Sequence, residues 1–354
     1  MTLSQAASTV RCGALGLVLT VAAAGLLVVV PRVAGTTWGA VAGVVAGLSP
    51  WWVLTLAVVW IAGLLAYTAV LTASLPGLSV RQGLALNLAG SAVANGVPAG
   101  GPASMALTTA MARSWGFGTT EVTAFLTVSN VWTAAGRVAA GLGGLVTSLA
   151  VRPGGGVPHG VVAVALPAAL VAVAGVGVLG REHRTAWLAG LGGRFVDRVD
   201  RRRGRPSRDV GRRLAASAVA ARRLSLDLSR RSWHRFTLGT TAYLVLLVVL
   251  LDACLRAVGH VTPVAVVVAA VGLERLATAV PLTPGGAGVA EVGLVGMLTA
   301  GGAGPAGVAA ALLYRLCTFG LEIPVGASVA VGWGRHRRRT SRHPVPSRRP
   351  PAPA

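Results

Sequence analysis

The chain has 354 residues, of which 54% are hydrophobic and only 12% are charged, and its mean hydropathy is +0.70. This composition excludes an ordinary soluble domain and predicts an all-α polytopic membrane protein. The net charge is +22, all basic residues are arginine, and half of them lie in residues 181–236, with a second group in 335–349.

The sequence carries no signature of catalysis or metal binding. Cys12, Cys254 and Cys317 are isolated in apolar segments, and the histidines are scattered. We find no nucleophile elbow, His-Glu-x-x-His helix or phosphate-binding loop. We therefore expect no enzyme activity, no metal and no cofactor. The basic regions lack interleaved aromatic residues, so we expect no nucleic-acid partner.

Apolar segments predict the helices in chain order. They cover residues 12–31, 51–74, 83–97, 102–113, 119–151, 160–180, 237–258, 261–281, 286–300 and 304–333. The first is interpreted as an uncleaved span, because it is long for a signal peptide. Some segments are marginal or short against the roughly 20 residues of a spanning helix, namely 83–97, 102–113, 261–281 and 286–300.

These short segments form two pairs, each joined by a turn rich in proline and glycine. The first turn is Val-Pro-Ala-Gly-Gly-Pro at 97–102, and the second is Pro-Leu-Thr-Pro-Gly-Gly at 281–286. Proline removes a backbone donor and glycine weakens a helix, so both turns are expected to break helices. The order of long helix, broken pair and long helix occurs in 51–151 and again in 237–333, which predicts a structural repeat.

Arginine placement predicts the topology. Basic loops remain in the cytoplasm, so the loop 181–236 and the tail 335–354 are placed there, with the N-terminus on the same side. The two broken pairs then enter from opposite faces. We therefore predict about six full spans plus two broken or re-entrant helix pairs, eight to ten hydrophobic helices in all, as an inverted-topology repeat. Residues 1–334 form one membrane domain, and 335–354 are expected to be disordered.

Three stretches of the sequence resemble a known family. They are VPLTPGGAGVAE, LLYRLCTFGLEIPVG and NLAGSAVANGVPAGGPASM. They resemble the transmembrane region of lysylphosphatidylglycerol synthases, over roughly residues 12–333. In bifunctional members this region flips an aminoacylated phospholipid that a separate soluble domain makes. No such domain is recognisable here, so the resemblance implies a stand-alone, flippase-like membrane module without aminoacyl-transferase activity.

Ionisable residues inside the apolar segments are the candidate substrate site, because charges in a bilayer are costly and usually line a path. Arg137 and Arg315 suit a lipid phosphate through the guanidinium fork. Alternatively, Arg315 forms a structural ion pair with Glu274 or Glu291. Helix N-termini after the glycine pairs could face an anionic headgroup, or the glycines could serve packing. The candidate set is Gly100, Gly101, Asn130, Arg137, Glu274, Thr283, Gly285, Gly286, Glu291, Tyr314, Arg315 and Glu322.

Two functions remain open, and an intramembrane enzyme acting on lipid carriers ranks below both because no acid/base pair of usable spacing stands out. The first is a translocase in the plasma (inner) membrane for a phospholipid or a polyprenyl-phosphate-type lipid. The second is a non-transporting scaffold or regulator of a separately encoded lipid or glycosyl transferase. Buried charges favour the first, since a scaffold gains little from them. Two local features have simpler interpretations: Asp252 and Arg256 are expected to pair with each other, and Ala215–Leu228 is expected to form an amphipathic helix on the lipid surface.

Overall fold

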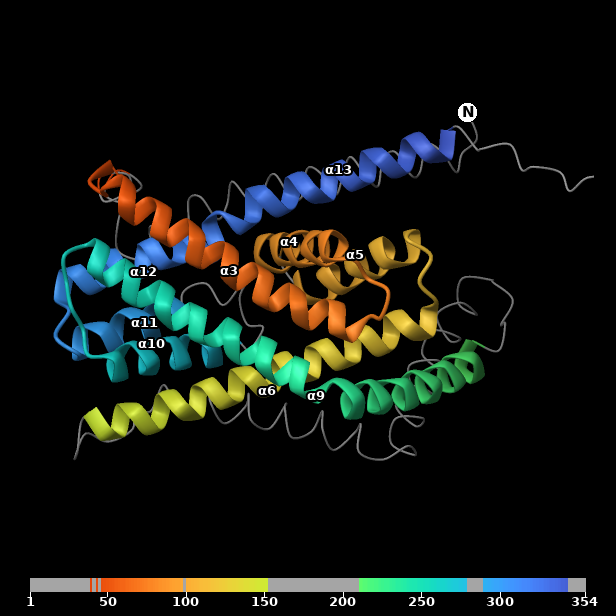
Figure 1. Cartoon of the computed structure of the whole chain (residues 1–354), viewed down its shortest axis with the longest axis horizontal. Coiled ribbons are helices and arrows are strands. Elements are labelled where there is room, and N and C mark those ends of the chain that lie inside the picture. The colour runs from red at the N-terminus through yellow and green to blue at the C-terminus, as the bar shows by residue number, and fades with distance from the viewer. Residues whose placement is uncertain are drawn as a thin grey trace, which may run out of the picture.

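The computed structural model describes residues 46–97, 100–151, 210–278 and 289–342, together with Gly39 and Gly43. Regular structure within these ranges is entirely helical, which confirms the all-α prediction. Figure 1 shows the helices as an elongated bundle whose long members run roughly along the longest axis. The predicted segments 12–31 and 160–180, and the turn at 281–286, lie outside the described residues.

The first half contains α3 (Pro50–Ser74), α4 (Val80–Gly96), α5 (Gly100–Ser114) and α6 (Thr119–Val151). α3 opens with a proline in its first turn, where the missing N–H costs nothing. α4 opens with a capping box, in which the Ser79 side chain accepts from the Gln82 backbone and the Gln82 side chain accepts from the Ser79 backbone at 3.0 Å. At the start of α6, the Glu121 carboxylate accepts the Gly118 backbone N–H at 2.6 Å.

The second half contains α9 (Val210–Ala257), α10 (Val264–Ala277), α11 (Val289–Ala300), α12 (Gly304–Arg315), the π-helix η2 (Leu316–Gly320) and α13 (Glu322–Arg342). Among the described residues, three helices are long and apolar enough to cross a membrane: Pro50–Ser74, Val219–Ala257 and Gly304–Arg337. The short helices α4, α5, α10 and α11 occupy the segments that the sequence predicted to be short.

Two predicted boundaries are wrong. The basic region 181–236 was expected to be a loop that contains a separate amphipathic helix at 215–228, but α9 runs without a break from Val210 into the apolar span. No glycine or proline occurs between residues 212 and 238, and the sequence there is rich in the good helix formers Ala, Leu and Arg. The predicted 304–333 helix is interrupted by η2 and continues to Arg342, so the expected disordered tail cannot begin at 335.

The apolar face of the basic part of α9 packs on protein. Ala221, Leu228 and Phe236 are buried against α3 and α6, where Val70 and Val128 are among their neighbours. This part of α9 therefore packs on α3 and α6 and does not lie on the lipid surface as expected. Its arginine-bearing face remains exposed.

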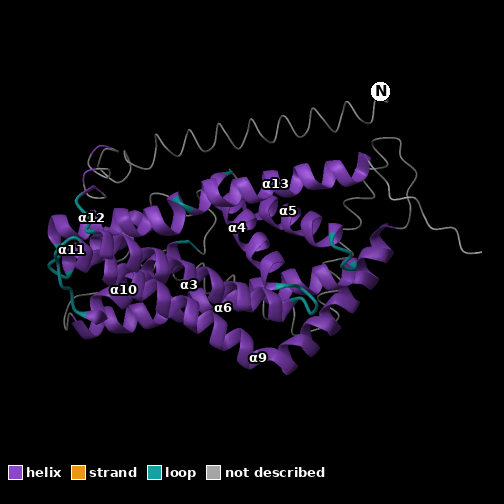
Figure 2. Cartoon of the chain, turned by 45° about the horizontal axis from the view of Figure 1, so that its top comes forward, coloured by secondary structure: helices purple, strands orange, loops and turns teal. Residues whose placement is uncertain are grey.

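Close packing of helices far apart in sequence holds the two halves together. α3 packs on α9, α6 on α10, and α4 on α13, and Figure 2 shows α13 lying over α4 and α5. Glycine permits the tightest contacts. A Cβ atom on Gly272 of α10 would overlap the Ala140 carbonyl oxygen of α6, and a Cβ atom on Gly326 of α13 would overlap the Leu88 carbonyl oxygen of α4.

Candidate functional site

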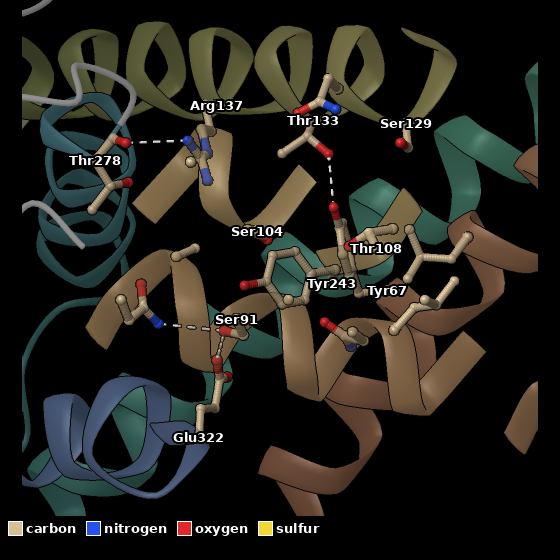
Figure 3. A pocket seen from close by; sticks show the side chains of 18 of the residues that line it. Tyr67, Ser91, Ser104, Thr108, Ser129, Thr133, Arg137, Tyr243, Thr278 and Glu322 are labelled. Atoms are coloured by element: carbon tan, nitrogen blue, oxygen red, sulfur yellow. Dashed lines mark hydrogen bonds between the residues drawn. The ribbon is translucent and has the colours of Figure 1, made fainter. Parts of the chain in front are cut away.

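A cavity of about 540 Å³ lies inside the bundle, bounded by α3, α4, α5, α6, α9, α10, the end of α12 and the η2–α13 segment. This volume is typical of a site for a small ligand. Its wall carries many hydroxyl and amide groups, including those of Tyr67, Asn87, Ser91, Ser104, Thr108, Ser129, Thr133, Thr240, Tyr243 and Thr318. Figure 3 shows several of these side chains directed into a common space.

Arg137 of α6 is a half-buried cation in this wall. Its Nη1 donates to the Thr278 carbonyl oxygen at 3.1 Å, just beyond the C-terminal end of α10 (Figure 3). A helix C-terminus carries a partial negative charge, which suits a guanidinium. Within the described parts of the chain, no carboxylate lies within ion-pair distance of Arg137. The guanidinium carries five N–H donors, and this hydrogen bond uses one of them.

Arg275 and Arg315 also line the cavity, but both form ion pairs with buried acids that do not line it. Arg275 forms a two-point ion pair with the neighbouring Glu274. Arg315 Nε donates to Glu291 Oε1 at 2.7 Å, and Arg315 Nη1 lies 3.3 Å from Glu274 Oε1. All four groups are buried, and Glu274 is 0% exposed. Two positive and two negative charges cancel, so this quartet is a neutral structural unit.

The ion pair that the sequence left open for Arg315 is thus present, and it involves both candidate acids. The Arg315 guanidinium also lies 4.8 Å from the centroid of the Phe319 ring. A phosphate contact by Arg315 stays a prediction.

Glu322 opens α13 and is half-buried in the cavity wall. Its carboxylate accepts a hydrogen bond from the Ser91 hydroxyl of α4, and Ser91 Oγ accepts from Asn95 Nδ2 at 3.3 Å (Figure 3). No ion pair involves Glu322 among the described residues. The π-helix between Arg315 and Glu322 changes the angular spacing that an α-helix would give, yet both side chains still line the same cavity.

The cavity brings together half of the predicted site, namely Gly100, Gly101, Asn130, Arg137, Arg315 and Glu322. The two glycines differ, because a Cβ atom on Gly100 would overlap the Ala94 carbonyl oxygen, whereas Gly101 has open space around it. Glu274, Glu291 and Tyr314 are buried outside the cavity lining. Thr283, Gly285 and Gly286 lie outside the described residues. The expected Asp252–Arg256 pair is confirmed at 2.7 Å.

Sequence reasoning missed Arg275, Tyr67 and Tyr243. The tyrosine rings lie 5.4 Å apart between centroids, on α3 and α9. The Tyr67 hydroxyl lies 3.2 Å from Thr133 Oγ1, and the Tyr243 hydroxyl accepts from Arg275 Nη1 at 3.5 Å. A signal did exist for Arg275, because it is a second ionisable residue beside Glu274 within an apolar run.

Membrane-length apolar helices around an internal polar cavity with buried arginines define an integral membrane protein with an internal ligand-sized site. The family model of the lysylphosphatidylglycerol synthase TM region matches residues 13–326, and the chain belongs to this family. The resemblance seen in the sequence is therefore confirmed. The matched region is a membrane region and not a catalytic domain. No curated protein and no solved structure matches the chain.

Proposed function

We propose that the chain is a lipid translocase of the plasma (inner) membrane, and that it binds the anionic headgroup of a phospholipid or a polyprenyl-phosphate-type lipid in the central cavity. The observation that carries this proposal is Arg137, a cation in a membrane cavity with no carboxylate partner among the described residues. A phosphate diester would supply the missing anion and accept two parallel guanidinium hydrogen bonds.

Other features of the cavity support an anionic ligand. The quartet of Glu274, Arg275, Glu291 and Arg315 is neutral as a unit, so it does not repel a phosphate. The N-terminus of α5 reaches the cavity at Gly100 and Gly101, and the first N–H groups of a helix favour an anion. Threonine, serine and tyrosine hydroxyls supply further donors for glycerol or sugar oxygens.

The cavity wall between α5 and α6 suits a lipid whose headgroup lies in the cavity while its acyl chains remain in the bilayer. Gly101, Pro102 and Met105 of α5, and Asn130 of α6, line the cavity and are also exposed. A headgroup can occupy the polar interior while acyl chains pass this exposed edge and remain in the bilayer. A water-soluble substrate would not need an apolar edge of this kind.

Reciprocal packing supports the inverted repeat. α4 of the first half packs on the long helix α13 of the second, and α10 of the second half packs on the long helix α6 of the first. The opening helices α3 and α9 pack on each other and run in opposite directions, as do α6 and α12–α13 (Figure 1). Two halves related in this way place a site at their interface, which is where the cavity lies.

Charge supports the orientation with both termini in the cytoplasm. Figure 1 shows the start of α9 and the end of α13 at the same end of the bundle. The first half of α9 carries Arg222, Arg223, Arg230 and Arg231, the C-terminal part of α13 carries Arg335 and Arg337, and Arg81 and Arg113 lie in the first turn of α4 and the last turn of α5. At the opposite end the described arginine is Arg256, which Asp252 neutralises. Arginine-rich ends stay on the cytoplasmic side.

Reconstitution tests the proposal. The full chain is placed in phosphatidylethanolamine vesicles that contain fluorescent phosphatidylglycerol, and dithionite quenching measures how fast the probe changes leaflets. We expect faster exchange than in empty vesicles. The exchange rate should fall about tenfold or more in Arg137→Gln, since a charge-assisted phosphate contact is worth roughly 1.5–3 kcal/mol.

Arg231→Gln is the control. It removes an arginine with a 77% exposed side chain and should behave like the wild type. Equal exchange in protein-containing and empty vesicles contradicts transport of this lipid and favours the scaffold alternative.

A further inference from the structure

Glu322 differs from the other buried acids of the site. Glu274 and Glu291 are each bound by arginine, whereas the partner of the Glu322 carboxylate is the Ser91 hydroxyl. Ser91 Oγ accepts a hydrogen bond from the Asn95 side-chain amide, and the Ser91 hydroxyl proton is donated to the Glu322 carboxylate. This hydrogen bond connects α13 of the second half to α4 of the first half.

Glu322 also lines two cavities. On one side it lines the central cavity. On the other it lines a small pocket of about 20 Å³ between α3 and α9, together with Trp60, Thr318 and Leu250. That pocket has room for about one water molecule. The Trp60 indole N–H lies beside the Glu322 carboxylate, yet it has no hydrogen-bond partner of good geometry among the described residues.

The small pocket points toward the end of the bundle opposite the basic end. It is lined by Val59 of the first half of α3 and by Leu250 near the end of α9. The central cavity extends the other way, to Leu71 near the end of α3 and Leu86 near the start of α4. Glu322 therefore lies where the polar central cavity meets a small, mainly apolar pocket, and the two extend toward opposite ends of the molecule.

We propose that Glu322 is a proton-binding site that exchanges protons with both of these spaces, and that the bound proton moves with the anionic lipid headgroup. The proposal rests on the lipid translocase function proposed above. On one side the Glu322 carboxylate takes a proton from hydronium and leaves water. On the other side the neutral acid returns the proton to water. No other reactant is required.

Electrostatics couples the proton to the lipid. The charged and titratable groups that share the cavity with Glu322 are Arg137 of α6, Arg275 of α10, Arg315 of α12, Tyr243 of α9 and Tyr67 of α3; α4 contributes the neutral Ser91 and Asn95. With the cavity empty of anions, the arginines favour the ionised carboxylate. A phosphate at Arg137 adds negative charge to the same cavity and so favours a neutral Glu322.

Protonation also acts on the packing of the two halves. It converts the charge-assisted hydrogen bond from Ser91 into a weaker neutral one. The π-helix η2 directly before Glu322 is a segment where α-helical hydrogen bonding is already interrupted. Loss of this contact therefore loosens α13 from α4 next to a natural hinge.

Infrared titration tests proton binding without any lipid transport. The full chain in phosphatidylcholine nanodiscs is acidified, and the protonated-carboxyl stretch is recorded as a difference spectrum. We expect one titrating band of the wild type to be missing in Glu322→Gln, retained in Asp227→Asn, and retained with a shifted midpoint in Ser91→Ala. A Glu322→Gln spectrum identical to that of the wild type overturns the proposal.

Exchange of fluorescent phosphatidylglycerol in vesicles then tests the coupling. On the alkaline side of its profile the wild-type rate should fall about tenfold per pH unit, as for one required proton, whereas the Glu322→Gln rate should not depend on pH. A wild-type rate independent of pH overturns the coupling even where lipid exchange is fast. Absence of exchange in the wild type contradicts the translocase function itself, and the infrared titration then still decides whether Glu322 binds a proton.

Discussion

Arg315 shows how a buried charge in this chain is stabilised. It lies between Glu291 and Glu274, with 6% of its side chain exposed, and Glu274 is shared with Arg275. A membrane protein keeps such charges only when partners surround them, because desolvation of an unpaired ion costs several kcal/mol. Arg137 lines the same cavity, and no carboxylate of the described residues forms an ion pair with it, so the two arginines are expected to respond differently to substitution.

Removing Arg315 should destabilise the fold. Arg315→Gln leaves Glu291 buried without its cation, and breaking a buried pair typically costs about 3–5 kcal/mol. We expect a lower thermal unfolding midpoint in detergent, together with partial recovery in Arg315→Gln/Glu291→Gln. A single variant as stable as the wild type would show that the quartet does not support the fold.

Substituting Arg137 should impair function and leave stability near the wild type. Arg137→Lys keeps a positive charge but loses the planar fork, so phosphate binding should weaken. We expect slower lipid exchange in vesicles with an unchanged unfolding midpoint. If activity and stability decline together, the role of Arg137 is structural.

At the scale of elements, the architecture depends on interrupted helices and on helices that approach closely. α4 and α5 are separated by the break after Gly96, and α12 and α13 by η2. These interruptions bring helix ends and the Glu322 carboxylate to the cavity wall. Gly326 then allows the backbone of α13 to approach α4, which places Glu322 within reach of Ser91.

Two glycines of α13 provide a matched test of this contact. A Cβ atom on Gly326 would overlap the Leu88 carbonyl oxygen, whereas a Cβ atom on Gly332 would have nothing within 4 Å. Gly326→Ala should therefore cost about 1–3 kcal/mol through overpacking, seen as a lower unfolding midpoint. Gly332→Ala should be neutral or slightly stabilising, because alanine favours a helix. Equal effects of the two substitutions would argue against the close α4–α13 contact.

At the scale of the whole molecule, charge asymmetry defines two ends. Arginines cluster at the end where α9 begins, while Val261 lies at the other end in the turn between α9 and α10, 72% exposed. A bundle with this distribution should cross the membrane with the arginine-rich end in the cytoplasm.

Cysteine labelling in intact cells checks this orientation. In a background without the native cysteines, a cysteine that replaces Val261 should react with an impermeant maleimide. One that replaces Arg231 should react only after the cells are permeabilised. The reverse pattern would invert the topology, and equal reactivity at both positions would exclude a membrane between the two ends.

Much of the fold was predictable because its signals are local. Apolar length and Pro/Gly breaks located the short helices α4, α5, α10 and α11, and four-residue spacing located the Asp252–Arg256 pair. A helix at 215–228 was predicted, but its continuity with the apolar span was missed because the basic region around it was interpreted as loop, although nothing between 212 and 238 breaks a helix.

The site was only partly predictable because its defining contacts are tertiary. Arg315 was recognisable as a buried charge, yet its choice between ligand and ion pair depends on where α10 and α11 place Glu274 and Glu291. The contact of Ser91 with Glu322 joins residues far apart in the chain. The π-helix follows no hydrophobic periodicity, so no pattern in the sequence indicates it.

The most direct measurement of the central claim is site-specific photocrosslinking to lipid. A photoreactive p-benzoylphenylalanine is placed at the position of Asn130, which lines the cavity, or at that of Val146, which is 67% exposed on the same helix and lies outside the cavity lining. The chain is reconstituted in phosphatidylethanolamine with a minority of phosphatidylglycerol, and mass spectrometry identifies the adducts. We predict that position 130 captures mainly phosphatidylglycerol while position 146 reflects the bulk mixture, and that Arg137→Gln removes the difference. Adducts of the same composition at both positions in the otherwise wild-type chain would contradict an anionic headgroup site at Arg137.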